Sequence, residues 1–327
     1  MSYTQLSADE RLELYRLSQT GGLSLRAIAT RMGRSHSTIS RELKRNQSQE
    51  QIYLPDSAQA QQQVRRQQSK QPFVGISEVC LARIKTQLRQ YHSPEQIAGS
   101  LKLKGLEWVS HETIYQMIYQ NHADMGAYRR YLRHSRIQRQ HRSAKRQKRG
   151  LIPNRVGIEQ RPEIAEQKSE IGHWEGDTII GGNHLGAIAT HVDKASKFLV
   201  ARVMKDRTAT EMNRVTIAAF ESIPAEQRQT MTFDNGKEFS KHEQLAATLG
   251  VQCYFANPYH SWERGLNEHT NGLIRQFFPK GTNFRIVKQH EVDKVVELIN
   301  HRPRKSLGYR TPHEVFWGQS GDGALQI

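Results

Sequence analysis

The most informative stretch is residues 231–278, which contains MTFDNGKEF and then LGVQCYFANPYHSWERGLNEHTNGLIRQFF. A short apolar run, typical of a β-strand, ends on the carboxylate of Asp234 at an Asn-Gly turn. The pattern predicts an amphipathic helix over 238–249, a second strand over 251–255 and a closing helix that carries Glu268. If these elements pack on one sheet, the two acids can meet and offer the hard oxygen ligands that magnesium prefers.

A third acid lies upstream, in the run GHWEGDTIIG at residues 172–181. Asp177 stands in a β-prone segment of this run, between glycines. Two more strand-like segments follow, at 191–193 and 198–204. This order predicts a mixed sheet flanked by helices, with acids from separate elements converging at one edge. The expected fold of this half is therefore an α/β ribonuclease-H-like domain.

Four motifs, GHWEGDTIIG, TFDNGKEF, NPYHSWERGLNEHTNGLIRQFFPKGTNF and LINHRPRKSLGYRTPHEVF, closely resemble the DDE transposases of the insertion sequence 30 family. The resemblance implies a retroviral-integrase-type catalytic domain and hydrolysis of DNA at the ends of the element. The freed 3′-hydroxyl would then attack a second phosphodiester. By the same resemblance, Asp177, Asp234 and Glu268 are the catalytic residues and metal ligands. Asp177 would bridge two Mg²⁺ ions, each of the others would hold one, and Mn²⁺ would be able to substitute.

Other acids near the three are alternatives. Glu175 lies two residues from Asp177 and so on the same face of a strand, which makes it a rival or auxiliary acid. Asp193 is predicted to form a surface ion pair with Lys194 or Lys197. Any single acid is more often a surface residue, but the three acids in this order favour a metal site.

Residues 1–46 have the pattern of a helix-turn-helix domain. A capping box starts the first helix at Ser7, and further helices are predicted to start near Ser24 and Ser35. The third helix turns its apolar side inward and leaves small polar and basic residues outside, which suits a DNA major groove. The alternative is a plain three-helix bundle with a solvated face. The predicted DNA-binding residues of this helix are Ser35, His36, Ser37, Thr38, Arg41 and Lys44.

The rest of the chain is predicted to contain four segments. They are a connector at 47–71, a second helical, helix-turn-helix-like domain at 72–132, a basic linker at 133–160 and the catalytic domain at 161–327. For the second helical domain, DNA binding and a purely structural bundle are equally favoured. The run 133–149 has eight basic residues and no acid, which favours tracking of the phosphate backbone. Arg264, Arg275 and Lys280 are predicted to grip DNA near the cut.

The composition is compatible with this interpretation. The formal net charge is +16 and the pI is near 9.9, which favours a polyanionic partner. The two cysteines lack CxxC spacing, so disulfide scaffolds and zinc fingers are not expected. The sequence shows no signal peptide and no apolar window of the roughly 18 residues that a membrane span needs. A bacterial cytoplasmic, DNA-associated protein without a membrane partner is expected.

The interpretation is thus a DNA transposase whose partners are double-stranded terminal inverted repeats and target DNA. A homodimer or higher homo-oligomer is expected in the synaptic complex, because two ends have to be held together. Two alternatives from other classes are a non-catalytic DNA-binding repressor and a different ribonuclease-H-like nuclease. The three acids argue against the first, and the helical units ahead of the core argue against the second.

Overall fold

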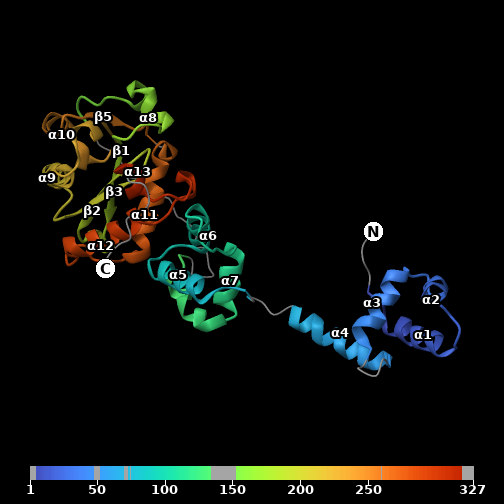
Figure 1. Ribbon diagram of the computed structural model, residues 1–327. Coiled ribbons are helices and arrows are strands. Elements are labelled where there is room, and N and C mark those ends of the chain that lie inside the picture. Colours follow the sequence, from blue (N-terminus) through green and yellow to red (C-terminus); the bar gives the residue numbers. More distant parts are fainter. Residues whose placement is uncertain are drawn as a thin grey trace. The chain divides into compact units, whose positions relative to one another are not determined.

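The computed structural model describes residues 5–47, 52–69, 73, 75–133, 152–258 and 260–318. Internal contacts divide the chain into two compact units, Met1–Gly75 and Ile76–Ile327 (Figure 1). Within the predicted basic linker, 133–160, residues 134–151 lie outside the described residues, and they include seven of the eight basic residues of the run 133–149.

The described part of the first unit consists of helices α1 (Ala8–Gln19), α2 (Leu25–Arg31), α3 (His36–Asn46) and α4 (Pro55–Ser69). Ser7, Ser24 and Ser35 cap the first three, and each side chain accepts the backbone N–H of the third residue after it. The predicted helix starts are therefore confirmed. Leu14 and Ile39 are fully buried in the core between these helices.

Helix α4 occupies most of the segment 47–71, which is predicted above to be a connector. Ala58 of this helix is fully buried in the core of the first unit. The buried guanidinium of Arg11 pairs with Glu42 at 2.6 Å and donates to Gln62 at 3.1 Å. These contacts make α4 a structural part of the helix-turn-helix unit.

The second unit begins with a helical bundle, residues 76–131. It contains α5 (Glu78–Arg89), α6 (Pro94–Leu103), α7 (His111–Tyr119) and the kinked 3₁₀ segment η1 (His122–Tyr131). Ser93 and Ser110 cap α6 and α7.

The helical bundle packs directly on the sheet-containing part of the same unit. The ring of Tyr91 meets that of Phe277 edge to face, with centroids 4.7 Å apart. Gly99 leaves room for the ring of Tyr309, which a Cβ at this position would overlap. Aromatic and backbone contacts of this kind give the bundle a structural role in the second unit.

A mixed five-stranded sheet forms the centre of the second unit (Figure 1). Its strands are β1 (His173–Ile180), β2 (Ala187–Asp193), β3 (Leu199–Met204), β4 (Thr230–Phe233) and β5 (Gln252–Phe255). The order is β3-β2-β1-β4-β5, with antiparallel β1–β2 and β2–β3 pairs and parallel β1–β4 and β4–β5 pairs. The predicted mixed sheet is confirmed.

Helices cover both faces of this sheet. One face packs on α9 (Ala209–Phe220) and α10 (His242–Leu249), and the other on α11 (Gly265–Phe277) and α12 (Gln289–Asn300). The short helices are α8 (Glu163–Gln167) and α13 (Pro312–Phe316). The 3₁₀ turns are η2 (Ile158–Gln160), η3 (Gly182–His184), η4 (Ala225–Gln227), η5 (Lys237–Phe239), η6 (Ser261–Arg264) and η7 (Lys305–Leu307).

The helix predicted over 238–249 starts later than expected. Residues 237–239 form a 3₁₀ turn, in which Glu238 is buried and pairs with Arg207 at 2.9 Å. The regular helix begins at His242 and ends, as predicted, at Gly250, whose φ of +68° is left-handed.

The surface ion pair predicted for Asp193 is wrong. Its carboxylate is fully buried and accepts the backbone N–H groups of Gly172 at 2.9 Å and Ser196 at 2.7 Å. Lys194 is also buried and pairs with Glu166 instead, at 3.1 Å. The chain turns tightly after β2, and this acid satisfies the donors of that turn.

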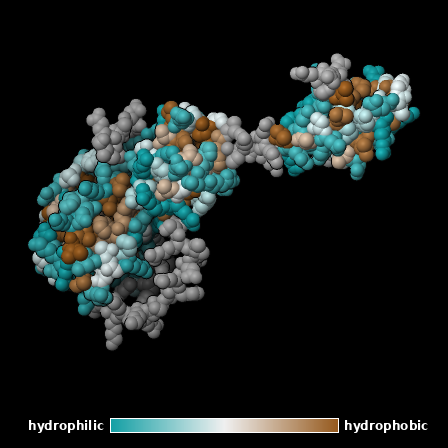
Figure 2. Space-filling model, turned by 90° about the horizontal axis from the view of Figure 1, so that it is seen from below, coloured by the Kyte–Doolittle hydropathy of each residue, from teal (hydrophilic) through white to brown (hydrophobic). Residues whose placement is uncertain are grey.

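The surface in the view of Figure 2 is largely hydrophilic, with hydrophobic residues in separate patches. No helix within the described ranges is long and apolar enough to cross a membrane.

Candidate active site

The strand register brings two of the three predicted acids level with each other. β1 and β4 run parallel, and Glu175 is paired with Thr232. Asp177 and Asp234 each lie two residues beyond this pair, so they stand side by side where the strands diverge. The Asp234 carboxylate also accepts the N–H of Gly236 at 2.8 Å, which closes the predicted Asn-Gly turn.

One guanidinium group bridges these two acids. Arg264 places Nη1 3.5 Å from Asp177 Oδ1 and Nη2 3.5 Å from Asp234 Oδ2. Nη1 also donates to the carbonyl of Gly176 at 3.0 Å. The arginine side chain is 13% exposed and the two acids are 25% and 28% exposed. The carboxylates are therefore close enough to share one cation and are still open to solvent.

Helix α11 carries the third predicted acid, Glu268, and contacts Asp177 through Asn271. Arg264 is the residue just before α11, and Glu268 and Asn271 lie three residues apart along one side of the helix. Asn271 Nδ2 donates to Asp177 Oδ2 at 2.9 Å, and Thr190 donates to Asn271 Oδ1 at 3.0 Å. Glu268 is exposed in the first turn of α11.

The described residues contain no group of three or more His, Cys, Asp or Glu side chains at metal-binding spacing. The structure brings Asp177 and Asp234 together, and it places Glu268 on α11, one turn before Asn271, which contacts Asp177.

The electrostatics of Asp177 favour a nearby cation. Burial raises the pKa of Asp177, the positive charge of Arg264 lowers it, and the charge of Asp234 raises it. An ionised pair of carboxylates in this position repels itself unless a cation lies between the two groups. Two oxygen-rich side chains that already share a cation fit a divalent metal ion.

Glu175, the alternative acid, is only 2% exposed and has other partners. Its carboxylate accepts the backbone N–H of Asn267 at 3.1 Å, and its carbonyl accepts Asn267 Nδ2 at 2.8 Å. Burial raises the pKa of Glu175. This acid therefore holds the start of α11 against β1.

Two predicted DNA contacts lie beyond the acids on the same chain segment. Arg275 donates to the carbonyl of Ile180 at 2.6 Å and so braces the end of β1. Lys280 is exposed in the turn that follows α11. Their contacts with DNA, and that of Arg264, stay predictions.

Asn271 was not predicted as a site residue, although it lies within residues 231–278. Its position three residues after Glu268 is the signal that could have indicated it, because a helix puts both residues on one side.

Helix α3, the helix predicted to bind DNA, has its apolar and polar residues on the expected sides. Ile39 and Leu43 of α3 are buried, whereas His36, Ser37, Arg41 and Lys44 are exposed. The hydroxyl of Ser35 bonds to those of Ser37 and Thr38 at 3.0 and 2.8 Å and caps the helix. The inward and outward sides of this helix agree with the prediction.

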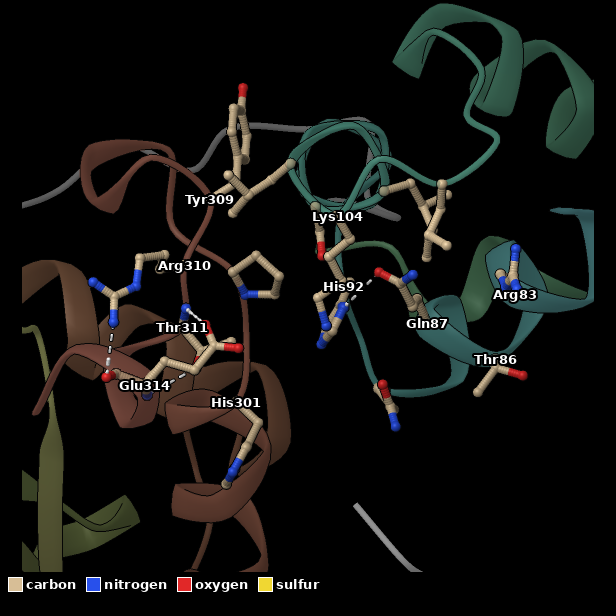
Figure 3. A pocket seen from close by; sticks show the side chains of 16 residues that line it. Arg83, Thr86, Gln87, His92, Lys104, His301, Tyr309, Arg310, Thr311 and Glu314 are labelled. Carbon is tan, nitrogen blue, oxygen red and sulfur yellow. Dashed lines mark hydrogen bonds between the residues drawn. The ribbon is translucent and has the colours of Figure 1, made fainter. Parts of the chain in front are cut away.

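A separate cavity of about 650 Å³ lies where the helical bundle meets the segment 301–314 (Figure 3). Glu314 is the one acid among the residues that line it, and it accepts the N–H of Thr311 at 2.7 Å. His92 bonds to Gln87 at 3.3 Å, as the dashed line in Figure 3 shows. This hollow lacks the paired carboxylates of the site above.

Two family models match separate parts of the chain. A helix-turn-helix domain matches residues 2–46, and an integrase core domain matches residues 167–261. Among solved structures, the catalytic core domain of BIV integrase aligns with 46% of this chain and 95% of its own, at 19% identity and a TM-score of 0.36. With the mixed sheet and its aligned acids, the two family models define a DDE-type enzyme that acts on DNA and carries its own DNA-binding domain. The integrase core domain implies that a divalent metal ion is the cofactor.

Curated relatives extend over nearly the whole chain. The transposase for insertion sequence element IS4351 of Bacteroides fragilis is 42% identical over 295 residues, 90% of each chain. The transposase for insertion sequence element IS1086 of Cupriavidus metallidurans is 36% identical over 96% of this chain and 94% of its own. Transposase InsI for element IS30C of Escherichia coli is 35% identical over 95% and 82%. The chain belongs to the insertion sequence 30 family of transposases.

Proposed function

We propose that Asp177, Asp234 and Glu268 form the active site at which this transposase cleaves the ends of its element and transfers the freed strand. The observation that carries the proposal is the shared guanidinium between two aligned carboxylates, with Glu268 on the adjacent helix side. The order of the acids along the chain is that of the family resemblance.

The proposed cofactor is Mg²⁺, two ions per site, with Mn²⁺ as a substitute. The carboxylates of Asp177, Asp234 and Glu268 would hold these ions. Two such ions supply activation of the attacking oxygen and stabilisation of the leaving oxygen at phosphorus. Asn271 fixes the orientation of the Asp177 carboxylate through its hydrogen bond to Oδ2.

The single test of this function is a cleavage assay on labelled duplex that carries the element end. The full chain is expected to release a 3′-hydroxyl at that end with Mg²⁺ and to join it to a second duplex. Binding without any metal-dependent cleavage would instead identify a DNA-binding repressor.

The first unit is proposed to recognise the terminal inverted repeats. A fragment Met1–Gly75 is expected to bind the element end by itself, because α4 completes the core of the helix-turn-helix unit. Arg41→Ala and Lys44→Ala should weaken this binding, measured by fluorescence anisotropy. Base readout would lower the affinity for the specific site alone, by roughly 1–3 kcal/mol per contact, whereas phosphate contact would lower it equally for random duplex.

Arg16→Ala is the matched control for that experiment, because this exposed arginine lies on α1 and its side chain is 68% exposed. Its affinity for the element end should stay at the wild-type value. No binding by the fragment would move recognition into the second unit.

Synapsis of two ends is proposed to need at least a homodimer. Sedimentation of the full chain with duplex element ends should show at least two subunits per pair of ends. A single subunit per complex under cleaving conditions would contradict this.

A further inference from the structure

Three arginines gather beside α11 without a carboxylate partner. Arg302 lies two residues after the end of α12, Arg304 two residues further, and Arg133 two residues after η1. None of the ion pairs within the described ranges includes these three guanidinium groups. The Nε atoms of Arg302 and Arg304 are buried and find no hydrogen-bond partner among the described atoms.

The remaining contacts of the cluster are weak or neutral. Both Nη atoms of Arg302 lie 3.5 Å from Gln276 Oε1, and Arg304 Nη2 donates to the carbonyl of Ile299 at 3.1 Å. Arg133 Nη2 lies 3.0 Å from the point where a Cβ on Gly272 would be. Glycine thus leaves space for a guanidinium against the helix.

The three charges act on one another. Burial and then the charges of Arg302 and Arg133 lower the pKa of Arg304 to about 9, which still leaves it charged at neutral pH. Burial and Arg133 lower the pKa of Arg302 to about 10. Like charges that are buried together without an acid are unfavourable unless an anion joins them.

The arrangement of exposed and buried groups shows how an anion would approach. Arg133 and His269 are exposed, Arg304 is half-buried, and Arg302 is 3% exposed behind them. Arg133 and Arg304 can therefore contact a bound anion directly. Arg302 lies behind them and attracts the anion by its charge without contacting it.

The cluster lies near Glu268. Gly272, which Arg133 covers, follows Glu268 by one turn of α11, a rise of about 6 Å. Phosphates of one DNA strand are spaced by about 3.4 Å along the duplex axis. The cluster is thus about one or two phosphates away from a phosphodiester held at the acids.

We propose that Arg133, Arg302 and Arg304 form a binding site for the DNA backbone, at a phosphate next to the one that is cut. Only its position relative to the cut rests on the proposed active site. The bidentate geometry of guanidinium groups suits phosphodiester oxygens. Contacts of this kind carry no sequence information and fix the register of the strand on the enzyme.

The test compares the full chain with Arg133→Gln and Arg304→Gln in a salt titration of random-duplex binding, in EDTA. Each variant is expected to flatten the slope of log K against log salt by about 0.9. Arg304→Lys keeps the charge and should keep the slope. Arg130→Gln, which removes an exposed arginine of η1 three residues before Arg133, should also match wild type. Slopes of Arg133→Gln and Arg304→Gln equal to wild type would overturn the proposal.

Two further readouts keep the test decisive. If Arg304→Gln lowers the melting temperature strongly, the salt slope of Arg133→Gln alone tests the proposal, because Arg133 is exposed. A neutral methylphosphonate beside the cut should weaken binding by wild type and have little added effect on Arg133→Gln, and equal effects on both proteins would overturn the assigned position. The salt slopes are measured without metal and so do not depend on catalysis. If the full chain fails to cleave in the Mg²⁺ assay, the proposed active site is contradicted, while the salt slopes still test the arginine cluster.

Discussion

Asp177→Asn, Asp234→Asn and Glu268→Gln are each expected to abolish cleavage and strand transfer while binding to the element end stays nearly unchanged. The acids would act through the metal ions, and the predicted DNA-reading helix belongs to the other compact unit. The rate loss should be on the order of a thousandfold or more, as for groups that act as a unit. For the same reason, the double variant of Asp177 and Asp234 should be no worse than either single variant.

Glu175→Gln is the control for these variants. It removes a buried acid two residues from Asp177, but glutamine keeps an oxygen that can accept the N–H of Asn267. Most of the cleavage activity should remain. Activity that survives in one of the three variants would remove that residue from the site, and loss in Glu175→Gln alone would move the assignment to Glu175.

The melting temperature of the metal-free protein adds a second readout for Asp177→Asn. Because burial raises the pKa of Asp177 in the folded state, ionisation of this acid lowers the free energy of unfolding at pH values above its unfolded-state pKa. The neutral amide should therefore hold or raise the melting temperature near pH 7. A marked fall would show that the acid is mainly structural.

Arg264→Gln is expected to bind Mn²⁺ about tenfold more tightly than the wild-type chain in the absence of DNA. Arg264 contacts the oxygens of both aligned acids, so its charge competes with a divalent ion for them. At a separation of about 5 Å, the repulsion between the two cations is about 1.7 kcal/mol even in a water-like dielectric. Such an energy corresponds to slightly more than a tenfold change in the dissociation constant.

Calorimetric titration of the full chain with Mn²⁺ measures this directly. Arg264→Lys should stay close to wild type, because it keeps the charge. Arg275→Gln removes an arginine from the same helix that contacts the Ile180 carbonyl, and it should also bind Mn²⁺ like wild type. Unchanged or weaker binding by Arg264→Gln would show that this guanidinium supports the metal site instead of competing with it.

Local patterns allowed much of the fold to be predicted. Serine caps indicated the helix starts, and alternating apolar runs indicated the strands around Asp177 and Asp234. These features depend on neighbours a few residues away. The expectation that the acids converge at one sheet edge came from placing their strands in one sheet, whereas the register of β1 and β4 was not predicted.

Contacts across the chain could not be predicted in the same way. Arg264 reaches the Gly176 carbonyl across 88 positions, and Asn271 reaches Asp177 across 94. Their roles depend on how α11 rotates against β1, which no local pattern determines. Asp193 was misjudged for a related reason, since a lysine beside it in sequence says nothing about which donors a tight turn leaves inside.

The ring of Tyr309 packs against the backbone of α6 at Gly99. This contact restricts which segments can be exchanged between this protein and its relatives. Any larger residue at position 99 would collide with that ring, so the two positions have to be inherited together. A chimera that takes only the helical bundle from another element would bring a foreign surface to the segment around Tyr309. Exchange at the boundary near residue 75 avoids this collision, so the first unit alone is the part that can be swapped without disturbing Gly99 and Tyr309.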